Sequence, residues 1–107
     1  MTVWTRLKEE LDRAGRAAQV AIDEGKLRLE LMRTRQLADK AAQAIGYALF
    51  RARQEGQELD GDTYARLSAT LGTHEKEIAR QEAELKAVRD ARQAPPAEPP
   101  ADQPAAQ

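Results

Sequence analysis

Hydrophobic residues recur at regular intervals in the second half of the chain, and this spacing is its clearest structural signal. Between Tyr64 and Val88, mostly apolar residues lie alternately three and four positions apart, which is typical of a helix packed along a narrow seam. Asp60 suits the N-cap of such a helix. We therefore predict a helix over residues 61–93, with these large residues on its seam: Tyr64, Leu67, Leu71, Ile78 and Leu85.

The same alternation occurs upstream and predicts a second helix over residues 26–54, closed by Gly56 as its C′ residue. The link between the two helices is short, so we expect them to be antiparallel neighbours. Residues that face each other across such a hairpin have numbers with a constant sum, which we predict to be 116. In this register the upstream helix contributes three large residues to the seam: Leu31, Ile45 and Leu49.

One layer of the predicted seam is polar on both helices, because Arg35 faces Gln81 at the same constant sum. A polar layer in an otherwise apolar seam penalises slipped registers. His74, the only histidine, falls on the seam of the second helix. We interpret it as a further register-setting residue, since no cysteine, second histidine or inward carboxylate cluster accompanies it.

The N-terminal residues 1–24 repeat the alternation with smaller side chains and predict an amphipathic helix. Gly25 can mark a hinge after this helix. A single glycine costs only ~1 kcal/mol relative to alanine, so one unbroken helix from about residue 3 to residue 54 is the alternative.

All five prolines lie in the last fourteen residues, which contain no large apolar side chain and which we predict to be disordered. The sequence therefore predicts an all-α fold. Its parts are an amphipathic N-terminal helix at residues 1–24, an antiparallel coiled-coil helical hairpin at residues 25–93 with its turn at residues 55–60, and a disordered C-terminal tail at residues 94–107.

Several large apolar residues lie off the predicted seam. A fully buried Leu or Phe contributes about 1.5–3 kcal/mol, so we expect another surface to cover them. The candidates are the N-terminal helix folded back, a second copy of the chain, or a different protein, and we favour the second copy. The apolar edge of the N-terminal helix also suits a membrane surface. The predicted contact residues are Trp4, Leu7, Leu11, Leu29, Met32, Tyr47 and Phe50.

Charge and composition argue against several function classes. The 17 basic and 18 acidic residues leave a net charge of −1, and the chain has no cysteine. It therefore lacks a thiolate nucleophile and a cysteine-ligated metal, and no phosphate-binding glycine motif is present. We predict that the protein is not an enzyme and that it has no catalytic, cofactor-binding or metal-binding residues. Residues 1–54 hold eleven basic and seven acidic residues, a dispersed surplus that gives nucleic-acid binding little support.

The opening VWTRLKEELDRAGRAA and the segment ADKAAQAIGYALFRARQEGQELD resemble a group of small bacterial helical-hairpin proteins in which a zinc ribbon often follows the hairpin. The markers are Trp4, Leu7, Ala14-Gly15, Ile45-Gly46 and Leu59-Asp60. This chain ends in an Ala/Pro tail without cysteines, so the resemblance implies no zinc-dependent role. A fainter similarity to phage-shock protein A, also a long hairpin with an amphipathic N-terminal helix, implies contact with a membrane surface.

These features lead us to expect a non-enzymatic, self-associating coiled-coil scaffold or adaptor protein. The alternatives are a peripheral membrane-surface protein that uses its N-terminal helix, and a nucleic-acid-binding adaptor. The expected assembly is a homo-oligomer, with an unidentified protein partner as the alternative. The N-terminus has no apolar run of the signal-peptide kind, and the resemblance implies a bacterial cytoplasmic setting, with the inner face of the membrane as the alternative location.

Overall fold

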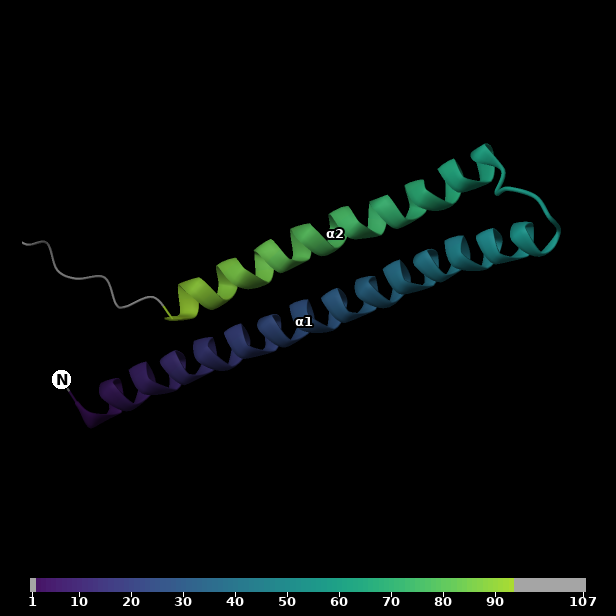
Figure 1. Cartoon of the computed structure of the whole chain (residues 1–107). Helices are drawn as coiled ribbons and strands as arrows, with labels where there is room; N and C mark the ends of the chain where they lie inside the picture. The colour runs from purple at the N-terminus through teal and green to yellow at the C-terminus, as the bar shows by residue number, and fades with distance from the viewer. Residues whose placement is uncertain (1, 94–107) are drawn as a thin grey trace, which may run out of the picture.

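The protein folds into two long antiparallel helices joined by a short turn (Figure 1). Helix α1 comprises Val3–Gln54 and helix α2 comprises Gly61–Gln93. The computed structural model describes residues 2–93, so the predicted tail lies outside the described residues. Over that part of the chain the fold is an all-α helical hairpin without strands, as the spacing of apolar residues predicted.

Helix α1 is unbroken over its 52 residues. Thr2 caps its N-terminus, because the Thr2 side-chain oxygen accepts a hydrogen bond from the Thr5 backbone N–H at 3.2 Å. The helix continues through Gly25, so the chain adopts the alternative of one continuous helix and has no hinge at this position. The N-terminal segment consequently does not fold back and covers none of the exposed apolar residues of α1.

The turn between the helices has the capping residues that the sequence predicted. Gly56 has a positive φ of 74°, and the Gln57 N–H donates to the Ala52 carbonyl at 2.8 Å. This is the hydrogen-bond pattern of a Schellman motif, which closes the C-terminus of α1. At the start of α2, Asp60 accepts a hydrogen bond from the Thr63 backbone N–H at 3.0 Å and so acts as its N-cap.

We expect Gly56→Ala to lower the free energy of unfolding by about 1–2 kcal/mol, because a Cβ is strained at positive φ. Gly46→Ala is the matched control. Gly46 lies within α1 with no neighbouring atom near its Cβ position, so the same change should raise stability by up to about 1 kcal/mol. Thermal unfolding of the two variants should therefore shift in opposite directions, and shifts of equal sign would contradict the left-handed turn.

The contact between the helices is narrow. Leu31 and Ala38 of α1 and Leu85 of α2 are buried. Half-buried residues flank them along the contact: Ile45, Leu67, Leu71, His74 and Ile78. Tertiary burial is therefore concentrated in the part of α1 that α2 accompanies.

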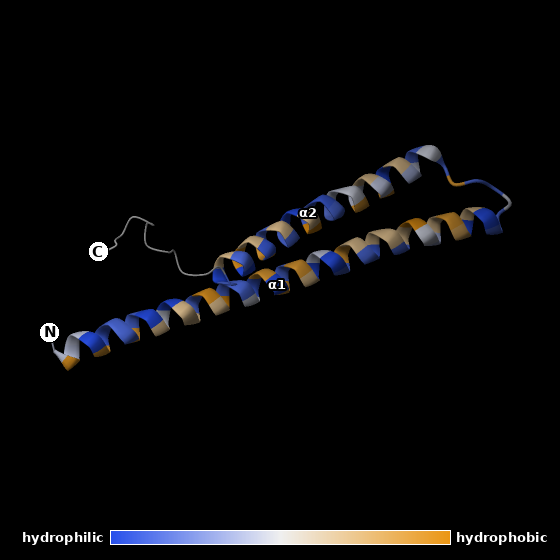
Figure 2. Cartoon of the chain, turned by 60° about the vertical axis from the view of Figure 1, so that its left-hand side comes forward, coloured by the Kyte–Doolittle hydropathy of each residue, from blue (hydrophilic) through white to orange (hydrophobic). Residues whose placement is uncertain are grey.

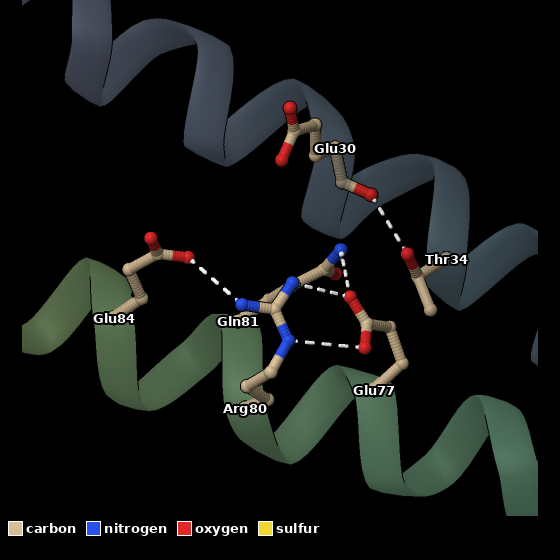
Figure 3. A network of polar contacts seen from close by, with 6 residues as sticks. All are labelled: Glu30, Thr34, Glu77, Arg80, Gln81 and Glu84. Carbon is tan, nitrogen blue, oxygen red and sulfur yellow. Dashed lines mark hydrogen bonds and ion pairs between the residues drawn. The ribbon is translucent and has the colours of Figure 1, made fainter.

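The structure differs from the predicted polar layer on α1, where Thr34 is buried and Arg35 is exposed. Instead of facing Gln81, Arg35 pairs with Glu82, with 2.7 Å between Nη2 and Oε2. A guanidinium is costly to bury. The Thr34 hydroxyl is easily buried because it donates to the Glu30 backbone carbonyl at 3.0 Å (Figure 3). The polar layer therefore consists of Thr34 and Gln81.

Two residues that the sequence placed on the seam are exposed: Leu49 by 45% and Tyr64 by 53%. Leu49 and Arg35 are both exposed, and each comes directly after a more buried residue, Ala48 and Thr34 respectively. The rotation of α1 that removes Arg35 from the contact therefore brings half-buried Ala48 toward α2 in place of Leu49. Tyr64 lies in the first turn of α2, opposite the end of α1, where few side chains are available to cover its ring.

Ion pairs on α2 surround the buried Gln81 (Figure 3). The Gln81 side-chain amide donates to Glu77 Oε2 at 3.1 Å, and Arg80 Nη2 lies 2.5 Å from the same oxygen. The hydrogen bond from Arg80 lowers the pKa of Glu77 below its ordinary value. Arg80 also contacts Glu84, with 3.4 Å between Nη1 and Oε1. These contacts orient Gln81 toward α1.

Candidate interaction surfaces

A line of exposed, uncharged residues runs along α1 on the side away from α2. At about 100° per residue, they fall within about 40° of a common line parallel to the helix axis. We call this set the outer stripe. Its members are Trp4, Leu7, Leu11, Ala14, Ala18, Ile22, Gly25, Leu29 and Met32.

The outer stripe is long and free of charge. Its nine positions span residues 4–32, a distance of about 42 Å at 1.5 Å per residue. Beyond Met32, the same side of α1 carries polar residues, including Gln36, Lys40 and Gln43. The exposed apolar surface of α1 is therefore interrupted after Met32.

The aromatic residues Tyr47 and Phe50 lie beyond this polar interruption and form a second, smaller apolar surface. They line a shallow groove together with Gln43 and Gly46. The Arg51 guanidinium carbon lies 5.7 Å from the centre of the Tyr47 ring, within range of a cation–π contact.

All seven residues that the sequence predicted for contact with a partner or membrane are exposed. The structure places five of them on the outer stripe: Trp4, Leu7, Leu11, Leu29 and Met32. It places Tyr47 and Phe50 on the separate aromatic surface. The two groups therefore belong to one helix but not to one continuous patch.

The N-terminal part of α1 extends past the end of α2 (Figures 1 and 2). Ala17 and Val20 still share a shallow groove with Val88 and Ala91 near the end of α2. Residues 3–16 therefore project alone, over about 21 Å. A lone helix of this length is marginally stable in water. Contact with another surface would therefore stabilise residues 3–16 more than the rest of α1.

A buried carboxylate lies where α2 ends against α1. The Glu24 side chain is 1% exposed, and Arg92 Nη1 lies 3.0 Å from its Oε1 atom. Arg28, one turn along α1, also pairs with Glu24, and Arg89 Nε lies 3.9 Å from Glu24 Oε2. Neither carboxylate oxygen has a well-aligned hydrogen-bond donor among the described residues, so opposite charge holds this cluster together.

From the sequence, Gly25 beside Glu24 was a candidate hinge with an unbroken helix as the alternative, and this cluster was not predicted. A signal for it was present in the sequence, because Glu24 precedes the seam residue Leu31 by one heptad. Glu24 and Arg92 also have the constant sum of 116 predicted for the hairpin. We call Glu24, Arg28, Arg89 and Arg92 the Glu24 cluster.

Within residues 2–93, no group of three or more His, Cys, Asp or Glu side chains is placed to hold a metal ion. Neither described helix combines the length and apolar character needed to cross a membrane. His74 is half-buried at the contact between the helices. Comparisons of the chain with models of protein families, with curated proteins and with solved structures find no match.

Proposed function

We propose that the protein is a non-enzymatic helical scaffold or adaptor that associates with further copies of itself. The observation that supports this proposal is the outer stripe. Its large residues are exposed although each could contribute roughly 1.5–3 kcal/mol on burial. A contiguous apolar surface on a small protein is typical of an interaction site.

A membrane surface is the alternative occupant of the outer stripe. Trp4 is 72% exposed near the tip of the projecting helix and suits a lipid interface. Residues 3–32, however, carry six basic and six acidic side chains. This balance gives no net attraction to anionic lipids, so the charges favour protein as the partner.

Light scattering of the purified chain over the micromolar range tests the proposal. We expect more than one protomer per particle. Leu29→Asp should shift the protein toward the monomer, because it places a charge on the outer stripe. Leu37→Asp is the matched control, since Leu37 is exposed to the same degree, 48% against 46%, but lies off the stripe.

Either of two results would contradict self-association through this surface. The first is a wild-type monomer at every concentration. The second is an equal response of the particle mass to Leu29→Asp and Leu37→Asp. Co-sedimentation of a monomeric wild type with anionic liposomes would support the membrane alternative.

A further inference from the structure

We propose that the occupant of the outer stripe is the same stripe of a second copy, running in the opposite direction and centred on Ala18. This inference rests on the proposed self-association and specifies its surface, direction and register. It concerns the nine residues of the outer stripe and the charges along one of its edges.

The spacing of the outer stripe is symmetric about Ala18. Counting outward from residue 18, the stripe has members at 14 and 22, 11 and 25, 7 and 29, and 4 and 32. An antiparallel copy related by a twofold axis at Ala18 therefore presents a stripe residue opposite every stripe residue. The 3.6-residue periodicity of the helix places these nine residues on one face. Their symmetric spacing about Ala18 determines which residues of the two copies lie opposite each other.

Side-chain sizes fit this register. Leu11 comes opposite the partner's Gly25, and nothing lies within 4 Å of the Cβ position at Gly25 in the single chain. Leu7 meets the partner's Leu29, and Ala18 meets its own copy on the axis. Large residues therefore meet small ones near the centre, which allows close approach, and large residues meet each other toward the ends.

The charges along one edge of the stripe distinguish the two possible directions. Lys8, Asp12, Lys26 and Glu30 lie about 80–120° round from the stripe, all exposed and all without an ion pair among the described residues. Their signs alternate along the helix. In a parallel copy this edge would instead face the opposite edge of the partner's stripe, where Arg6, Glu10 and Arg28 carry charges of both signs, so no consistent pairing of opposite charges would result.

In an antiparallel copy the order of these charges is reversed. Lys8 then lies beside the partner's Glu30, and Asp12 lies beside the partner's Lys26. Each pair is offset by about 3 Å along the axis, which long side chains span easily. Opposite charges at the edge add little affinity, but they favour one direction over the other.

The antiparallel arrangement also covers the projecting helix. Residues 3–16 of one copy lie along residues 20–33 of the other, most of which α2 accompanies in the partner's own hairpin. The stripe measures about 42 Å by about 10 Å, so the two copies together bury on the order of 900 Å². This area is below the roughly 1,200–2,000 Å² of standard stable interfaces and in the range of weak, transient ones, so we expect a reversible dimer.

Cysteine cross-linking tests the direction, because the chain has no cysteine of its own. Leu11→Cys and Gly25→Cys proteins should form a mixed disulfide dimer when combined under oxidising conditions, in excess over either self-linked dimer. Wild-type self-association combined with efficient self-linking of Leu11→Cys would indicate a parallel pair and overturn this inference while leaving the proposed function standing. A monomeric wild type in light scattering would overturn both.

Spin labels provide a second measurement that needs no disulfide geometry. In an antiparallel dimer, labels at Ala18→Cys should lie close together, and labels at Lys8→Cys should lie about 30 Å apart. Short distances at both sites would contradict the antiparallel register. Ala18→Glu, which places two like charges on the axis, should weaken the dimer at least about tenfold, whereas Ala83→Glu on the exposed surface of α2 should not. Equal effects of these two substitutions would also contradict the inference.

Discussion

Leu85→Asp is expected to unfold the hairpin. Leu85 is the most buried apolar residue of α2, and it lines the same depression as Leu31 of α1. Removal of a buried leucine costs about 2–5 kcal/mol, and burial of a carboxylate adds to that cost. The sum is comparable with the whole stability of a small domain, about 5–15 kcal/mol. Helices depend on tertiary packing, so far-ultraviolet circular dichroism should report the loss of most helical signal.

Leu37→Asp provides the control for this experiment, because it makes the same chemical change at an exposed leucine of α1. We expect the Leu37→Asp protein to keep its ellipticity and to melt within a few degrees of the wild type. If Leu85→Asp retained the wild-type ellipticity and Tm, Leu85 could not lie at the contact between the helices.

The ends of the helices at the turn could be predicted from the sequence because local rules determine them. Gly56 lies four residues before Asp60, and each has the role that its chemistry favours. Capping depends on a few neighbouring backbone groups, so it does not require knowledge of the packing. The continuity of α1 through Gly25 was harder to predict, because a single glycine weakens a helix without ending it.

The rotation of α1 about its own axis could not be predicted from apolar spacing alone. The seam can pass through Ala41 or Ala42 with little change in apolar volume, so the pattern of small residues fits two rotations. Arg35 and Thr34 determine which rotation occurs. A threonine hydroxyl can bond to its own helix, whereas a guanidinium requires water or a carboxylate. The exposure of Leu49 follows from this choice.

The Glu24 cluster could not be predicted for a related reason. Charged residues of α1 are expected on its solvent side, but three arginine side chains from two helices can cover a carboxylate together. The three arginine side chains stay about half exposed while their guanidinium nitrogens contact the Glu24 carboxylate. Only the antiparallel register brings Arg89 and Arg92 to this position, so the cluster depends on the tertiary fold.

Glu24→Ala is expected to release the last turns of α2 from α1. The substitution removes the only carboxylate of the Glu24 cluster and leaves three guanidinium groups to repel one another. Because these groups are about half exposed, water compensates part of the loss, and we expect a cost of about 1–3 kcal/mol. The effect should be local. Amide hydrogen exchange should speed up over residues 85–93 and remain unchanged near the turn.

Asp23→Ala tests whether this effect belongs to the buried carboxylate or to acidic charge in general. Asp23 neighbours Glu24 but is exposed, and its only polar contact among the described side chains is the hydrogen bond from Gln19 at 3.0 Å. We expect its loss to change stability by less than about 0.5 kcal/mol. Added salt should slow exchange in Glu24→Ala by screening the arginines. Equal exchange in the two variants would mean that α2 is held at its end by apolar contacts alone.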